Sequence, residues 1–162
     1  METLSRSTYE DERGKPMPSV LHSLLQKRLI QLFGDYEPPY LVFSELSLEI
    51  GDTFVTPDLS VYRDVEIDFL SDTVRMAEPP LLAVEIASPT QGMQDLLDKI
   101  RDLLDHGVQS CWLVLPPLKT ITVFTEGMES KTHASGTITD PVTDIAVEWD
   151  AVFATPGAAP EA

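Results

Sequence analysis

Basic residues are scarce in this chain. Eleven Lys and Arg residues stand against 27 Asp and Glu residues, which gives a formal net charge of −16. A protein that coats nucleic acid neutralises phosphates with clustered Lys and Arg, and here these residues are scattered from Arg6 to Lys131. The composition therefore argues against a general nucleic-acid coat. It leaves a local nucleic-acid site open, because salt screens charges over about 8 Å and the sign at the site matters more than the total.

Cysteine and long apolar runs are scarce as well. The single cysteine, Cys111, cannot form an intrachain disulfide or a multi-thiolate zinc site, and its place in the run CWLVL predicts a buried thiol. No uncharged apolar stretch reaches the roughly 18 residues of a membrane helix, and residues 1–15 are polar rather than a signal core. We therefore expect a cytoplasmic protein that uses no membrane.

The length suits one domain. A chain of 162 residues can bury a real core but is short for two domains of typical size. Apolar residues make up 43% and charged residues 23%, close to average globular usage, so wholesale disorder is not indicated. We expect residues 1–162 to form a single domain, with residues 1–16 as a loose arm or first edge strand and residues 155–162 as a flexible tail.

Two segments carry the spacing of amphipathic helices. In residues 21–33 apolar side chains recur every three or four positions, with Ser19 as a candidate N-cap and Gly34 as the stop. A second apolar stripe runs through residues 93–104 and ends at Gly107. The spacing predicts one helix early in the chain and one in its middle.

The first strands are predicted between these helices. Residues 41–50 alternate with period two, and residues 58–62 alternate again after a turn. We expect the two segments to be antiparallel neighbours. The alternation places Glu45 and Asp58 on the same kind of polar face.

The centre of the chain has the order strand, helix, strand. Residues 81–87 are an apolar run bounded by proline, typical of a central strand buried on both faces, and residues 111–115 form a second apolar run. The helix between them implies a right-handed crossover and at least one parallel pair. Before this unit, residues 64–78 predict a loop with a short helix around Phe69. After it, residues 119–125 predict a hairpin strand, followed by weaker strands and a short closing helix.

Glu85 is the most informative residue, because it is a carboxylate in the middle of the buried run. Burying a charge is costly unless it binds a metal, pairs with a cation or is protonated. Asp58 begins the strand after Pro57 and is its natural companion. Two carboxylates and the backbone carbonyl of Ile86 would make an all-oxygen site suited to Mg²⁺ or Mn²⁺. The alternative is that both acids meet buried basic partners or face solvent at an edge.

Lys99 is the second informative residue. Around an ideal helix, at about 100° per residue, it lies at the border of the apolar stripe, from which its head could reach over the sheet. A lysine there could hold a scissile phosphate or position the attacking water. On spacing alone, a surface ion pair with Asp95 one turn earlier is the favoured alternative.

Three further residues are candidates for supporting roles. Glu45 could supply an outer carboxylate from the neighbouring strand, although an exposed strand residue needs no such role. His22 lies beside the apolar face of the first helix and is more often a packed histidine than a proton shuttle. Ser88 precedes Pro89 and is expected to turn the chain, although its place just beyond Glu85 could aim it at the site.

The order of these motifs is similar to that of a known family. The matching residues are Met17-Pro18-Ser19, His22, Glu45, Pro57-Asp58, the VEIASP segment at 84–89, Asp95-Leu96 with Lys99, Gly107-Val108 and Trp112-Leu113-Val114. In order and spacing they resemble the Uma2-like (DUF820) proteins, described as restriction endonucleases of the PD-(D/E)XK nuclease superfamily. The likeness covers most of the chain.

The resemblance implies a fold and a site. The fold is an α/β (α+β) restriction-endonuclease-like domain, with a mixed central sheet flanked by helices. The site is a magnesium-dependent phosphodiester hydrolase centre with Asp58 and Glu85 as metal ligands. The superfamily lysine normally follows the glutamate by two residues, where this chain has Ala87, and the family's relocation of it to the next helix points to Lys99. Two departures from the family pattern, Leu103 and Leu115, affect no expected ligand.

Three hypotheses about function follow. The leading one is a Mg²⁺- or Mn²⁺-dependent endonuclease that acts on DNA, with homodimerisation as a way to cut both strands. The second is a catalytically silent nuclease-fold protein that binds or scaffolds, which the charge supports, since residues 64–105 hold ten Asp and Glu against three Lys and Arg. The third is a subunit whose partner supplies a basic DNA-binding surface.

Overall fold

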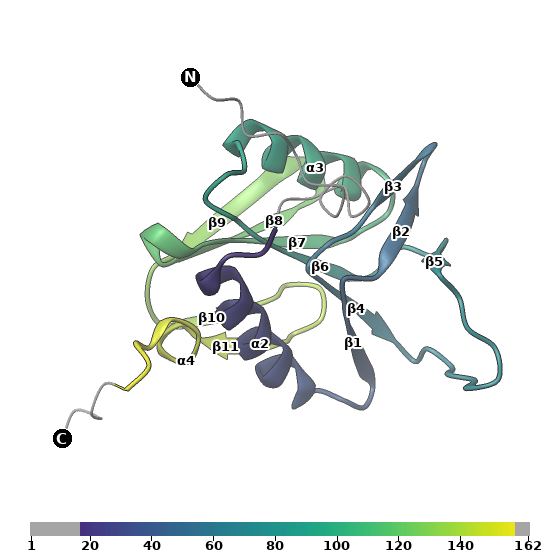
Figure 1. The fold of residues 1–162 in the computed structure, drawn as a ribbon, viewed down its shortest axis with the longest axis horizontal. Helices are drawn as coiled ribbons and strands as arrows, with labels where there is room; N and C mark the ends of the chain where they lie inside the picture. Colours follow the sequence, from purple (N-terminus) through teal and green to yellow (C-terminus); the bar gives the residue numbers. More distant parts are fainter. Residues whose placement is uncertain (1–16, 158–162) are drawn as a thin grey trace.

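The computed structural model describes residues 17–157. Its centre is a six-stranded mixed sheet, with one long helix packed on each face (Figure 1). This is the mixed α+β architecture expected from the sequence. The expectations for residues 1–16 and for the last five residues of the tail lie outside the described residues.

The first long helix, α2 (Val20–Gly34), begins and ends as its sequence predicts. The side chain of Ser19 accepts a hydrogen bond from the backbone N–H of His22, and this N-cap satisfies one of the free donors of the first turn. Leu25, Leu29 and Phe33 form the buried stripe of the helix. His22 is buried on the same helix, which brings one polar ring into the apolar interface.

The six strands lie in the order β1-β4-β6-β7-β8-β9. Their bounds are β1 (Tyr40–Ser44), β4 (Leu59–Arg63), β6 (Leu82–Ile86), β7 (Ser110–Leu115), β8 (Thr120–Thr125) and β9 (Glu129–His133). Strands β6 and β7 are parallel and are joined by the second long helix, α3 (Met93–Asp105), while the other neighbouring pairs are antiparallel. The predicted central strand, the crossover helix and the hairpin strand after it are all confirmed.

Alternation along the strands divides the core into two layers. On β6, Leu82, Val84 and Ile86 pack in the layer that holds α2, whereas Ala83 packs in the layer that holds α3. Because side chains on a strand alternate between faces, Glu85 also points to the α3 side. The carboxylate in the central strand therefore faces the helix that carries Lys99.

The α2 layer is completed by the C-terminal part of the described chain. Two short strands, β10 (Thr137–Thr139) and β11 (Ala146–Glu148), pair antiparallel, and the closing helix α4 (Trp149–Phe153) follows them. Single-turn 3₁₀ segments, η1 (Pro116–Leu118) and η2 (Glu126–Met128), make the turns around β8. The weaker strands and the short closing helix agree with the sequence prediction.

The single alternating strand predicted for residues 41–50 is wrong. The chain forms β1 and then β2 (Ser47–Ile50), which belongs to a separate three-stranded sheet in the order β3-β2-β5. The break falls at Glu45, whose φ of 52° lies in the left-handed region and cannot continue a strand. Strand β3 (Thr53–Val55) returns as a hairpin partner of β2, as the predicted turn requires.

The short helix predicted around Phe69 is also wrong. Residues 64–74 form turns and bends, and the segment ends in the two-residue strand β5 (Arg75–Met76), which pairs parallel with β2. Phe69 and Leu70 are each 98% exposed. With no apolar surface to pack against, three or four residues of helical pattern do not suffice to form a helix.

No helix within residues 17–157 is long and apolar enough to cross a membrane.

The buried cysteine gives a first testable expectation. Cys111 is fully buried in β7, and burial, followed by the nearby charges of Glu85 and Asp140, raises the pKa of its thiol far above the ordinary range. We expect no reaction of the native protein with a thiol reagent such as DTNB at pH 8, and one thiol per chain after unfolding in urea. A native thiol that reacts at the rate of free cysteine would contradict this.

Candidate functional site

Two carboxylates lie at the same end of adjacent central strands. Leu59 at the start of β4 pairs with Val84 of β6. The next residue toward that end is Asp58 on one strand and Glu85 on the other, and each is 1% exposed. The expectation that Asp58 lies on the same kind of polar face as Glu45 is wrong, because Asp58 is buried while Glu45 is exposed. Pairing of β4 with the buried strand β6 and coverage by α2 remove Asp58 from solvent.

Asp58 is held by contacts from two sides. Its Oδ2 accepts the backbone N–H of Ile86 at 2.7 Å, and its Oδ1 lies 2.9 Å from Nε2 of His22. Its own backbone N–H donates to the carbonyl of Val84 at 3.0 Å. The N–H of Ile86, rather than the carbonyl proposed as a metal ligand, is therefore the group of that residue that contacts Asp58.

Glu85 meets a basic partner from the helix that covers it. Nζ of Lys99 lies 2.9 Å from Oε1 of Glu85, and it also donates to the carbonyl of Thr56 at 3.2 Å. The Lys99 side chain is 20% exposed, so its head stands at the boundary between the core and solvent. Lys99 does reach over the sheet, as the sequence allows. The pairing with Asp95, which spacing alone favours, is wrong, because it is not the pair that forms within the described part of the chain.

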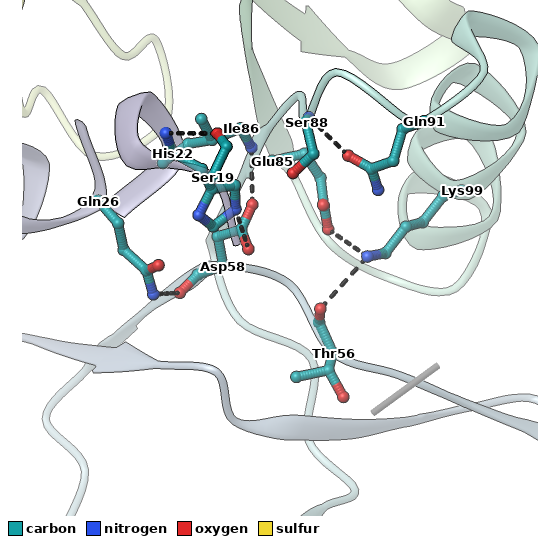
Figure 2. Close-up of polar contacts among 10 residues, drawn as sticks. All are labelled: Ser19, His22, Gln26, Thr56, Asp58, Glu85, Ile86, Ser88, Gln91 and Lys99. Carbon is teal, nitrogen blue, oxygen red and sulfur yellow. Dashed lines mark hydrogen bonds and ion pairs between the residues drawn. The ribbon is translucent and has the colours of Figure 1, made fainter. Parts of the chain in front are cut away.

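The two acids face their own partners. In Figure 2 the carboxylate of Asp58 turns toward His22 and Ile86, while that of Glu85 turns toward Lys99. The sequence left open whether these acids hold a metal or meet basic partners. In this structure both meet nitrogen groups, and this arrangement is compatible with either role, since each carboxylate oxygen offers about two acceptor positions.

The other supporting candidates take different places. The side chain of Glu45 is exposed, and its contribution is a backbone N–H that donates to the carbonyl of Asp58 at 3.1 Å. Ser88 is buried and turns the chain, as expected. Its N–H donates to Oε1 of Gln91, and its carbonyl accepts the N–H of Gln91.

One residue at the site was missed by the sequence analysis. Gln26 lies one helical turn after His22 on α2, and its Nε2 donates to the backbone carbonyl of Asp58 at 3.3 Å. The only signal in the sequence is the spacing of four between His22 and Gln26, which places both on one face of the helix. That spacing does not reveal a partner 32 residues away.

The donor chemistry of this site fits a hard divalent cation. Proteins usually bind Mg²⁺ through one or two carboxylates, with water and substrate phosphates completing the octahedron. Asp58 and Glu85 supply two buried carboxylates at one end of the sheet. Within residues 17–157 no group of three or more His, Cys, Asp and Glu side chains is gathered around a possible metal position. The residues thus offer the ligand type that Mg²⁺ or Mn²⁺ prefers rather than a closed cage.

The fold defines a class. A mixed central sheet flanked by helices, with its parallel pair joined by α3, is a nuclease-type fold. A family model described as "Uma2: Putative restriction endonuclease" matches residues 6–151. The chain belongs to the Uma2 family.

A solved structure supports the fold. The crystal structure of a putative nuclease belonging to DUF820 from Anabaena variabilis ATCC 29413 superposes with a TM-score of 0.75 at 23% sequence identity. The similarity covers 85% of this chain and 83% of that one. None of the curated proteins compared with the chain matches it. The predicted restriction-endonuclease-like fold is confirmed.

Proposed function

We propose that this protein is a metal-dependent endonuclease that hydrolyses phosphodiester bonds of DNA. One observation carries the proposal: two buried carboxylates, Asp58 and Glu85, end adjacent central strands beside the half-buried lysine of α3 in a nuclease fold. Buried carboxylates gathered with a lysine in this way are found more often at functional sites than elsewhere in a protein. Membership of the Uma2 family, whose description is "Putative restriction endonuclease", supports the same reaction class.

The proposed roles follow from the chemistry of each side chain. Asp58 and Glu85, with the carbonyl of Ile86, would hold Mg²⁺ or Mn²⁺. The bound ion would make its water more acidic and offset charge on the phosphate. Lys99 stands at the solvent boundary, where its ammonium group can contact a phosphate oxygen and stabilise negative charge that develops during attack. The buried strand ends keep bulk water from the acids, which strengthens these electrostatic effects.

The contact between Glu85 and Lys99 suits this proposal. An ion pair at 2.9 Å keeps the ammonium group next to the acid in the absence of substrate. When a phosphate and a cation bind together, the contact between Lys99 and Glu85 would be replaced by two others. The phosphate would contact Lys99, and the cation would contact Glu85. No net charge would then be buried without a counter-charge.

The lysine provides the direct test. Replacing Lys99 with alanine should slow Mn²⁺-dependent cutting of DNA by about 100-fold or more, the usual effect of removing one group that stabilises transition-state charge. The assay compares supercoiled, linear and single-stranded DNA with and without Mn²⁺. Arg101→Ala is the matched control. Arg101 lies on the same helix, and its side chain forms an ion pair with the exposed Asp98 and not with Glu85.

Equal cutting by the Lys99→Ala variant and the wild type would remove Lys99 from the proposed machinery. Absence of cutting by the wild type on every substrate would instead favour a second function.

The second candidate is a catalytically silent nuclease-fold protein that binds or scaffolds. It is favoured by the observation that each acid already has a nitrogen partner, Asp58 in His22 and Glu85 in Lys99. The charge of −16 supports it too, because DNA is repelled unless a cation or a basic partner intervenes. Calorimetry with Mn²⁺ separates the two candidates, since a scaffold with internally compensated acids should bind no ion.

Three expectations extend the proposal. We expect a homodimer, which sedimentation velocity would test, because nucleases that cut both strands often pair. We expect a cytoplasmic location. If DNA binding needs a positive surface from a partner subunit, cutting should appear only after co-purification of the assembled complex. Glu45 and Ser88 stay predicted supporting residues.

A further inference from the structure

Helix α2 contacts Asp58 with two side chains that lie one turn apart. Nε2 of His22 lies 2.9 Å from the Asp58 carboxylate, and Nε2 of Gln26 donates to the Asp58 backbone carbonyl at 3.3 Å. Figure 2 shows that both side chains extend from the same helix toward Asp58. The helix therefore contacts the side chain and the main chain of this residue separately.

The orientation of the His22 ring is set by this contact. His22 is 3% exposed, and its Nδ1 has no hydrogen-bond partner within the described part of the chain. Because a carboxylate oxygen that accepts from the ring requires a proton on Nε2, His22 acts as the donor and Asp58 as the acceptor. The contact with Asp58 thus sets which nitrogen of the His22 ring faces the carboxylate.

Asp58 lies just before β4, between Pro57 and Leu59. Its backbone N–H donates to the carbonyl of Val84, which fixes its main chain against β6, while its carboxylate depends on other donors. Its backbone carbonyl accepts from Gln26 and from the N–H of Glu45. Its carboxylate accepts from His22 and from the N–H of Ile86. Two of these four donors belong to α2, and those two come from side chains that substitution can remove.

We propose that His22 and Gln26 are positioning residues, which together hold the Asp58 carboxylate against β6 in the orientation that the metal site requires. This inference rests on the proposed function. Neither residue touches the reacting phosphate in this role. They act through Asp58, in the way that hydrogen-bond partners of metal ligands fix the direction of the ligand and tune its affinity.

The test uses three variants of His22 and Gln26 and one control. His22→Leu removes the donor at similar volume. His22→Gln restores an amide N–H near the position of Nε2. Gln26→Met removes the donor to the carbonyl and keeps the length of the side chain. Leu25→Ala is the matched control, since Leu25 is buried on the same helix and its loss weakens packing without removing a donor to Asp58.

Two readouts are measured on the full chain. Hydrogen exchange of the Ile86 amide by NMR reports whether Asp58 still accepts that N–H. Calorimetry with Mn²⁺ reports the affinity of the site. We expect His22→Leu to speed Ile86 exchange relative to the other amides of β6 and to weaken Mn²⁺ binding about 10- to 100-fold. Gln26→Met should weaken it about two- to tenfold, and His22→Gln should restore most of the wild-type affinity.

The outcomes distinguish the positioning role from the proposed function. If the wild type binds no Mn²⁺, the proposed function fails, and the positioning role for a metal ligand falls with it. If the wild type binds Mn²⁺ and His22→Leu binds it no more weakly than Leu25→Ala does, the function stands and the positioning role is overturned. Failure of His22→Gln to restore binding would overturn it in favour of direct contact between the imidazole and the ion.

Discussion

Replacing Glu85 with glutamine should abolish Mn²⁺ binding and slow DNA cutting by about 100-fold or more. Glutamine keeps the shape of the side chain but removes the negative charge that a divalent cation needs. The remaining acid, Asp58, already accepts two hydrogen bonds and supplies a single carboxylate. We therefore expect no measurable heat on titration with Mn²⁺, compared with a clear isotherm for the wild type.

The same variant should fold without a large penalty. Removing one partner of a fully buried pair costs about 3–5 kcal/mol because a charge is stranded. Lys99 is 20% exposed, so its ammonium group can turn to water once Glu85 is neutral. We expect the melting temperature in metal-free buffer to stay near that of the wild type. Added Mn²⁺ at about 100 times the dissociation constant should stabilise the wild type by about 2.7 kcal/mol and leave the variant unchanged.

A matched control separates the site from general loss of charge. Glu129→Gln removes an exposed carboxylate from the edge strand β9 and should leave Mn²⁺ binding and cutting intact. If Glu85→Gln retains both activities, Glu85 is no metal ligand. A large loss of stability in metal-free buffer would instead identify the pair with Lys99 as structural, which is the scaffold alternative.

The main elements of the site could be predicted because its signals are local. Glu85 is conspicuous as the one carboxylate in an apolar run between prolines, and the run is short enough to identify a central strand. For Glu85 the inference depends on residues within one element, where periodicity and burial are tightly linked. Helical spacing places Lys99 at the border of the apolar stripe, but spacing alone favours a pair with Asp95, and the resemblance to the Uma2 family is needed to point to the site.

The contacts that complete the site could not be predicted, because they join residues far apart in sequence. Gln26 donates a hydrogen bond to Asp58, which is 32 residues away in the sequence. Nothing in the sequence around Gln26 indicates that partner. The break at Glu45 is hidden for a different reason. The alternating pattern runs through it unchanged, and only a φ of 52° shows that the chain leaves one sheet and enters another. Tertiary packing selects that conformation, and a pattern of apolar and polar residues does not encode it.

Asp140 is a buried acid away from the site, and we expect it to contribute strongly to the free energy of unfolding. Asp140 follows β10 and is fully buried. Its Oδ1 accepts Nε1–H of Trp112 at 2.9 Å, while its Oδ2 accepts the backbone N–H and the hydroxyl of Thr143, each at 2.9 Å, and the N–H of Val142 at 3.2 Å. Trp112 lies at the centre of the sheet on β7. Asp140 therefore ties the β10-β11 hairpin to the middle of the core through a fully satisfied carboxylate.

Replacing Asp140 with alanine should lower the free energy of unfolding by about 4 kcal/mol, since several buried donors lose their acceptor at once. For a chain of this size that corresponds to a fall in melting temperature of about 8–16 °C. Asp140→Asn should lose less, because one oxygen can still accept the three donors that now reach Oδ2. Melting followed by Trp fluorescence and by far-UV circular dichroism measures the effect, with the exposed Asp150→Ala as the control.

The function of the Asp140→Ala variant is equally informative. Below its melting temperature it should bind Mn²⁺ as the wild type does, because Asp140 packs on the α2 layer and Glu85 faces α3. Loss of binding in a variant that is still folded would show that the hairpin supports the site through Trp112. Unchanged stability would show that the Trp112 indole N–H finds another acceptor when Asp140 is removed, and that the carboxylate adds little to the core.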